Sequence, residues 1–128
     1  MIALFDADDR WHERVTEALR PFRGEVVTSA ACVTEAAWIT SRKAPQALDG
    51  LLKWLARGAV RICNIEPADC RRIADLSQVY RNMDPDFADL ALIALAERER
   101  IRDIMTVDKR DFDVYRLRSG RMLKNVLA

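Results

Sequence analysis

The sequence of 128 residues is long enough for one domain with one hydrophobic core. Hydrophobic residues make up 50% of the sequence and charged residues 32%, a composition that excludes a disordered chain. The net charge of +1 excludes a protein whose whole surface is basic. No apolar run approaches the roughly 20 residues of a membrane span and no leader segment is recognisable, so we expect a cytoplasmic protein without a membrane partner.

Hydrophobic periodicity, proline positions and capping residues predict helices that alternate with short strands. The expected helices span residues 10–19, 30–42, 45–57, 67–80 and 86–100, and the expected strands lie within residues 26–28, 60–65, 101–107 and 124–127. This alternation predicts an α/β fold with a parallel sheet, in which functional groups gather at the carboxyl ends of the strands. Since no repeat or linker divides the chain, we predict a single domain over residues 1–128.

The cysteines and the histidine narrow the chemistry that the chain can perform. Cys32, Cys63 and Cys70 lack a C-x-x-C spacing, which argues against structural zinc or a disulfide framework and predicts free, mostly buried thiols. His12 is the only histidine, so mechanisms that need paired histidines are excluded. The acidic residues therefore carry most of the usable chemistry.

Glu35 is placed unusually for an acid on a helix. Its neighbours three and four positions away are all apolar: Ala31, Cys32, Trp38 and Ile39. A charged glutamate on an apolar helix face needs a partner, and a divalent cation would supply one. The alternative is a carboxylate that reaches solvent or pairs with Arg71 or Arg72.

Asp89 is the second such acid, on the helix that begins near Asp86. If Asp84 is the N-cap and Pro85 the first helical residue, Asp89 lies past the first turn, where the helix dipole no longer explains it. Asp86 lies one turn earlier on the same side, and two close carboxylates repel unless a cation sits between them. The alternative for Asp86 is a simple N-terminal helix acid.

Asp108 follows an apolar strand and is expected at its carboxyl end, where parallel sheets keep their sites. The alternative is an N-cap of the next segment. Asp111 and Asp113 flank Phe112 in a charged loop, and we expect both to be solvated. Three element ends could thus bring Glu35, Asp89 and Asp108 to one pocket.

Carboxylate ligands favour magnesium or manganese, and such ions catalyse the hydrolysis of phosphodiester bonds. A local excess of cations, six basic residues against two acids, follows Asp108 and suits a wall that faces phosphates. The basic residues are Lys109, Arg110, Arg116, Arg118, Arg121 and Lys124. The alternative is a solvated face or a docking surface for an acidic protein.

Three segments of the sequence resemble the PIN-domain family, and within it the VapC-type toxins of bacterial toxin–antitoxin pairs. The segments are FDADDRWHERV, VVTSAACVTEAAWI and DFADLALIALAERERIRDIMTVDKRDFDVYR. The third is the most specific, because it pairs an FAD-type helix with a T-x-D-x-R-D-F strand end.

This resemblance implies a three-layer α/β/α sandwich with a central parallel sheet and an endoribonuclease that depends on Mg²⁺ or Mn²⁺. By position, Glu35, Asp89 and Asp108 match the family's catalytic, metal-binding acids, and Asp86 is an auxiliary acid. Lys109, Arg110 and Arg116 are then the expected RNA contacts. The implied partners are an RNA substrate, a small antitoxin protein and a second copy of the chain.

The sequence departs from the family pattern at its start. Family members open with a strand that carries an aspartate, ahead of the stretch matched here by residues 2–5. That first strand is missing from this sequence, so we expect a metal site short of one carboxylate and a weakened activity. The alternative function is a non-catalytic, truncated PIN domain that binds RNA or an antitoxin.

Overall fold

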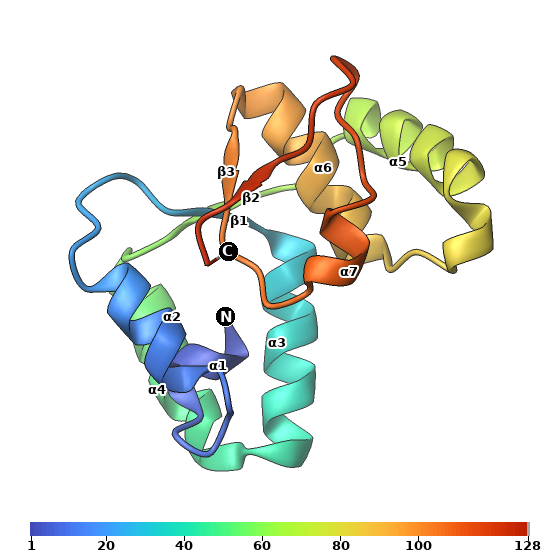
Figure 1. Ribbon diagram of the computed structural model, residues 1–128. Coiled ribbons are helices and arrows are strands. Elements are labelled where there is room, and N and C mark those ends of the chain that lie inside the picture. The colour runs from blue at the N-terminus through green and yellow to red at the C-terminus, as the bar shows by residue number, and fades with distance from the viewer. Residues whose placement is uncertain (128) are drawn as a thin grey trace.

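The computed structural model describes residues 1–127, which fold into short helices that alternate with four short strands (Figure 1). The helices are α1 (Ile2–Phe5), α2 (His12–Leu19), α3 (Ala30–Lys43), α4 (Pro45–Ala56), α5 (Pro67–Val79), α6 (Phe87–Glu99) and α7 (Lys109–Phe112), with a 3₁₀ turn, η1, at Arg81–Met83. The strands are β1 (Val27–Ser29), β2 (Arg61–Cys63), β3 (Asp103–Ile104) and β4 (Lys124–Asn125). The predicted α/β class is confirmed.

All strand pairing in the described residues is parallel, as predicted. Val27 of β1 is in register with Arg61 of β2, and Asp103 of β3 with Lys124 of β4. The strands form two separate pairs rather than one continuous sheet. Within residues 1–127, β1 is therefore paired with β2 alone and β3 with β4 alone, and β1 and β3 are not hydrogen-bonded to each other. A largely apolar cavity of about 1030 Å³, lined by residues 26–28 and 101–107 among others, lies between the pairs.

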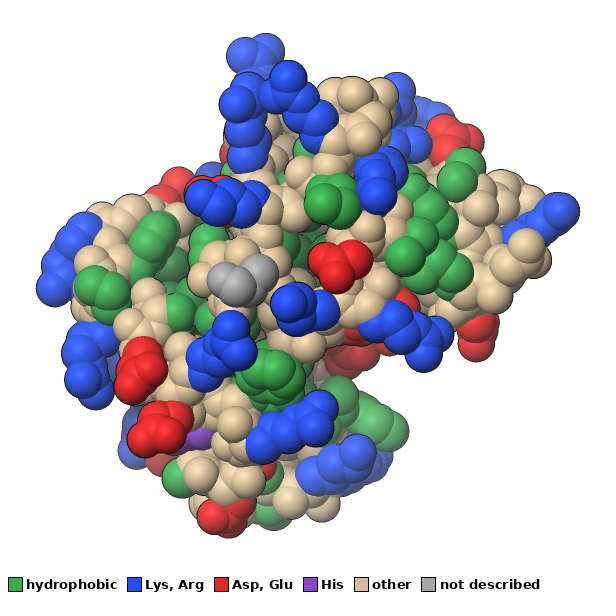
Figure 2. Space-filling model, viewed as in Figure 1, with side chains coloured by type: hydrophobic (Ala, Val, Ile, Leu, Met, Phe, Trp, Pro, Cys, Tyr) green, Lys and Arg blue, Asp and Glu red, His purple; other side chains and the backbone are tan. Residues whose placement is uncertain are grey.

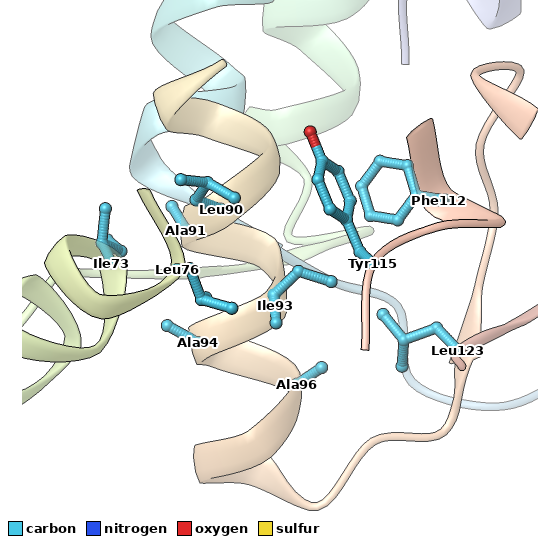
Figure 3. Packing of buried hydrophobic residues seen from close by; sticks show 10 residues of the cluster. All are labelled: Ile73, Leu76, Leu90, Ala91, Ile93, Ala94, Ala96, Phe112, Tyr115 and Leu123. Atoms are coloured by element: carbon cyan, nitrogen blue, oxygen red, sulfur yellow. The ribbon is translucent and has the colours of Figure 1, made fainter. Parts of the chain in front are cut away.

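Helix α6 is the centre of the main core. Because it is apolar on nearly every side, it is buried on nearly every side, and it packs against both α5 and α3. Figure 3 shows its side chains among those of α5 and of the C-terminal segment. The cluster comprises Ile73, Leu76, Leu90, Ala91, Ile93, Ala94, Ala96, Phe112, Tyr115 and Leu123. This packing gives the start of α6 a firm position next to α7.

The start of α6 differs from the expectation. Asp84 has φ of 49° and ends the 3₁₀ turn, which redirects the chain at Pro85. The helix begins at Phe87, and its N-cap is Asp86, whose Oδ1 accepts a hydrogen bond of 2.7 Å from the Ala88 N–H. The prediction that Asp84 is the N-cap was wrong, because Asp84 has a left-handed backbone and ends the preceding 3₁₀ turn, so the helix starts two residues after Pro85.

The N-cap of α3, the state of the cysteines and the absence of a membrane span were also predicted. Ser29 caps α3 as expected, since its Oγ accepts a hydrogen bond of 3.2 Å from the Cys32 N–H. The three cysteines are free as predicted, although only Cys63 is buried and Cys70 is exposed. Within residues 1–127, every helix is too short or too polar to cross a bilayer.

Candidate metal centre

Three aspartates converge where the start of α6 meets α7. Asp89, Asp108 and Asp111 each offer one carboxylate oxygen, and these oxygens all lie within 4.8 Å of one another. Asp89 comes from the first turn of α6, Asp108 is the N-cap of α7 and Asp111 lies in the first turn of α7. The structure therefore brings two of the predicted acids together and adds a third.

The loop after β3 is held by side-chain hydrogen bonds that fix Asp108. The Asp108 N–H donates to Thr106 Oγ1 at 3.1 Å, and Oδ1 of Asp108 accepts from the Asp111 N–H at 3.2 Å. Asn125 of β4 holds Thr106 in turn, because its Nδ2 donates to the Thr106 carbonyl at 2.8 Å. The alternative interpretation of Asp108 as an N-cap is therefore confirmed, and its carboxylate also lies near Asp89 and Asp111, while its role as a metal ligand stays a prediction.

The expectation that Asp111 is solvated was wrong. Its side chain is half-buried, and Oδ1 is buried without a hydrogen bond among residues 1–127. The nearest cation, Arg110, is mostly exposed and its Nε lies 3.4 Å from that oxygen. The three-residue spacing from Asp108, which places two acids on one helical face, was the signal that could have identified Asp111.

Glu35 and Asp86 lie beside this group rather than within it. The pKa of Glu35 is raised by burial of its carboxylate, and further by the hydrogen bond and the charge that it meets at Asp86. Residue Glu35 as a whole is nevertheless exposed, and Trp38 on the same helix face is 58% exposed, so the helix face is not covered and the alternative of a carboxylate that reaches solvent agrees with the structure. Apolar neighbours on a helix do not show whether another element covers them.

The electrostatics of the site are dominated by repulsion between like charges. The pKa of Asp89 rises from 3.8 to about 7, first because the carboxyl is buried and then because Asp86, Asp108, Glu35 and Asp111 add negative charge. Close carboxylates raise one another's pKa in this way unless a cation neutralises them. The oxygen-only donor set and the orphaned Oδ1 of Asp111 fit a hard divalent cation such as Mg²⁺ or Mn²⁺.

The three predicted RNA contacts differ in how free their charges are. Lys109 and Arg110, at the start of α7, are exposed. Nη1 of Arg116 instead donates to the carbonyls of Asp113, Val114 and Tyr115, at 2.7, 2.8 and 3.1 Å. Figure 2 shows Lys and Arg side chains spread over much of one face rather than gathered in one patch. The side chain of Lys109 is thus the freer of the two charges at the start of α7, because Nε of Arg110 lies 3.4 Å from Oδ1 of Asp111.

Comparisons with known proteins identify the family and the fold of the chain. A family model described as "PIN domain" matches residues 1–117. Ribonuclease VapC26 of Mycobacterium tuberculosis (strain ATCC 25618 / H37Rv) is 31% identical over 117 residues, which cover 91% of this chain and 87% of that protein. The crystal structure of VapC20 from Mycobacterium tuberculosis, described as a sarcin-ricin loop cleaving toxin, is similar with a TM-score of 0.78 at 16% identity, and the match covers 85% of each chain.

Proposed function

The chain belongs to the PIN domain family and resembles its VapC-type toxins, and from this premise we propose that it is an endoribonuclease that needs Mg²⁺ or Mn²⁺. The observation that supports the metal dependence is the convergence of the Asp89, Asp108 and Asp111 oxygens within 4.8 Å. Hydrolysis of RNA phosphodiester bonds is the reaction that such a carboxylate-held ion serves.

The roles of the acids follow from where they lie. Asp89 and Asp108 would hold the ion together with Asp111, while Glu35 and the auxiliary acid Asp86 approach from the adjacent side. When bound, a divalent ion supplies Lewis-acid activation of the phosphate and of an attacking water. The protein's own contribution is to hold the carboxylates close together before the ion arrives, through the caps of α6 and α7.

The proposed partners follow from the family and from the surface near α7. Lys109 and Arg110 would contact RNA phosphates, and the RNA substrate would be met in the cytoplasm. The hydrogen bonds of Arg116 to backbone carbonyls make its guanidinium a support of the α7 turn rather than a free phosphate ligand. A small antitoxin protein would neutralise the enzyme, and a second copy of the chain would complete a homodimer.

The test is cleavage of a mixed RNA pool in the presence of Mn²⁺. Glu35→Gln and Asp89→Asn should each lower the rate by about 100-fold or more, as removal of a group that stabilises transition-state charge does. The matched controls are Glu13→Gln on α2 and Asp75→Asn on α5, which change exposed acids outside the site and should cleave like wild type. Equal cleavage by all five proteins would indicate a contaminating nuclease.

A non-catalytic module that binds RNA or an antitoxin is the second candidate. The observation in its favour is the cavity between β1 and β3, because a divided sheet supports the acids less firmly than a continuous one. The same feature would impair rather than abolish catalysis if the first candidate holds. RNA binding without any Mn²⁺-dependent cleavage would favour the binding module.

A further inference from the structure

The hydroxyl of Tyr115 is buried and has no obvious structural purpose. The residue is 1% exposed, and its Oη makes no hydrogen bond within residues 1–127. A buried hydroxyl without a partner destabilises a folded protein, so native structures rarely keep one without a reason. A phenylalanine would fill the same space without that cost.

Neighbouring aromatic rings fix the direction of the hydroxyl. Tyr115 meets Tyr80 and Phe112 edge to face, with ring centroids 5.1 and 5.4 Å apart. Its N–H donates to the Asp111 carbonyl at 3.0 Å, so Tyr115 follows Asp111 by one helical turn. Figure 3 shows the ring beside Phe112, with the hydroxyl at the level of Leu90 near the start of α6. The hydroxyl therefore points to the end of α6 that carries Asp89.

The acids of the candidate site surround this hydroxyl. The pKa of Tyr115 is raised to about 12, first by burial and then by the negative charges of Asp111, Asp89, Asp108 and Asp86. The largest of these charge effects comes from Asp111, whose Oδ1 is also buried without a hydrogen bond among the described residues. The buried hydroxyl of Tyr115 thus senses the charge of a carboxylate whose Oδ1 has a single ion-pair partner among the described residues, the mostly exposed Arg110.

On the premise of the proposed metal-dependent function, we propose that Tyr115 is a positioning residue. Its hydroxyl, unbonded among residues 1–127, turns to donate a hydrogen bond to the Asp111 carboxylate when a divalent cation binds, and so orients that carboxylate toward the ion. Ligands of metal ions are commonly oriented by such outer hydrogen bonds, and their loss weakens metal binding 10–100-fold. A neutral hydroxyl suits this place, because it orients one carboxylate without adding charge to a site already crowded with acids. Tyr115 touches neither the ion nor the RNA.

The test measures Mn²⁺ affinity, by electron paramagnetic resonance of free Mn²⁺, in wild type and in Tyr115→Phe. We expect the variant to bind Mn²⁺ about tenfold more weakly. Tyr80→Phe is the matched control, since it removes a half-buried hydroxyl that accepts from the Arg116 N–H at 2.9 Å, and it should bind like wild type. Thermal melting without Mn²⁺ verifies that both variants fold, and Tyr115→Phe should melt no lower than wild type.

A double-mutant cycle separates positioning from a general effect of the substitution. In an Asp111→Ala background, Tyr115→Phe should weaken Mn²⁺ binding by less than about twofold, because the partner of the hydroxyl is already gone. Addition of Mn²⁺ should also change the tyrosine absorbance of wild type and of Tyr80→Phe but not of Tyr115→Phe. If the Tyr115 hydroxyl served folding alone, Tyr115→Phe would show no coupling to Asp111→Ala in Mn²⁺ binding and would not abolish the absorbance change.

Several results would overturn the positioning role. Equal Mn²⁺ affinity of wild type and Tyr115→Phe would do so, as would a further tenfold loss from Tyr115→Phe in the Asp111→Ala background. Failure of wild type to bind Mn²⁺ would overturn both this role and the proposed function. Mn²⁺ binding with the expected loss in Tyr115→Phe, but without RNA cleavage, would support the positioning role and overturn the nuclease function alone.

Discussion

The N–H of Asp111 donates a hydrogen bond of 3.2 Å to Oδ1 of Asp108, so one short turn of helix holds both carboxylates at the edge of the site. This turn is anchored from outside, because Asp108 is bonded to Thr106 and Thr106 to Asn125 of β4. The geometry of the acids therefore depends on residues that carry no charge.

Asn125 offers a test of that dependence. Asn125→Ala removes the bond to the Thr106 carbonyl and the bond of 3.1 Å that Oδ1 accepts from the Leu127 N–H. We expect the free energy of unfolding, from urea denaturation, to fall by about 1–3 kcal/mol. Asn82→Ala, at an exposed residue of the 3₁₀ turn, is the control and should change it by less than about 0.5 kcal/mol. A loss no larger than that of the control would show that the loop does not rely on Asn125.

The raised pKa of Asp89 predicts how stability changes with pH in metal-free protein. The folded state keeps this proton up to about pH 7, whereas an unfolded chain loses it near 3.8. Between these values the folded state binds more protons, so stability should fall as the pH rises. Urea unfolding in the presence of a chelator should show this fall in wild type and in Asp75→Asn.

Asp89→Asn provides the complementary measurement. It removes the titrating group and one of the repelling charges, so the fall in stability between about pH 4 and pH 7 should become much shallower. Above about pH 7 the variant should be at least as stable as metal-free wild type. A slope that Asp89→Asn leaves unchanged would mean that another group controls the pH dependence.

The ion pair of Arg72 and Glu97 should stabilise the contact between α5 and α6. Nε of Arg72 lies 3.1 and 3.0 Å from the two carboxylate oxygens, Nη2 lies 2.8 Å from one of them, and both side chains are about 15% exposed. Arg72→Met should lower the free energy of unfolding by about 1–3 kcal/mol, since it leaves the poorly solvated Glu97 carboxylate with the exposed Arg118, whose Nε lies 3.3 Å away, as its remaining cationic partner.

The matched control for Arg72 is Lys53→Met on α4. Nζ of Lys53 lies 2.7 Å from Asp49, but both side chains are more than 70% exposed, so the loss should be below about 1 kcal/mol. The double variant Arg72→Met/Glu97→Met should recover stability relative to Arg72→Met alone, because the poorly solvated carboxylate is removed as well and the remaining Arg118 is mostly exposed to solvent. Equal effects of Arg72→Met and Lys53→Met would contradict the assignment.

The exposed cations of α7 should contribute to RNA binding through the phosphates. In Mn²⁺-free buffer, Lys109→Ala/Arg110→Ala should weaken binding of a labelled single-stranded RNA, measured by fluorescence anisotropy. The dependence of log affinity on log salt should become shallower by about 1.4, or about 0.7 for each lost contact. Lys53→Ala/Arg57→Ala, which changes an exposed cation of α4 and the exposed cation that follows its last residue, should leave that slope unchanged. A change of equal size in both pairs would indicate a diffuse field instead.

The sequence was sufficient to predict the alternation of helices and strands and the alternative of Asp108 as an N-cap, whereas Asp89 lies in the first turn of α6 and not past it as predicted. Those predictions rested on local signals, namely periodicity and the position of an acid at the end of an element. Asp111 was missed because the α7 helix spans only four residues, too few for periodicity to distinguish it from a charged loop. Its burial comes from Phe112 and Tyr115 packing against α6, a long-range contact.

The surroundings of Glu35 and Arg116 could not be predicted for the same reason. The apolar neighbours of Glu35 suggested a covered helix face, but whether a face is covered depends on elements far away in the sequence. The charge count around Arg116 suggested a phosphate ligand, whereas its guanidinium satisfies carbonyls at the end of its own turn. Composition counts charges but does not show which of them are already bonded.

The most direct test of the central claim is the rate of RNA cleavage as a function of Mn²⁺ concentration, in wild type and in Asp89→Asn. The proposed site predicts cleavage that saturates with Mn²⁺, stops with a chelator, returns with excess Mn²⁺ and is lost in Asp89→Asn. Cleavage that continues in the chelator, or that Asp89→Asn supports at the wild-type rate, would contradict it.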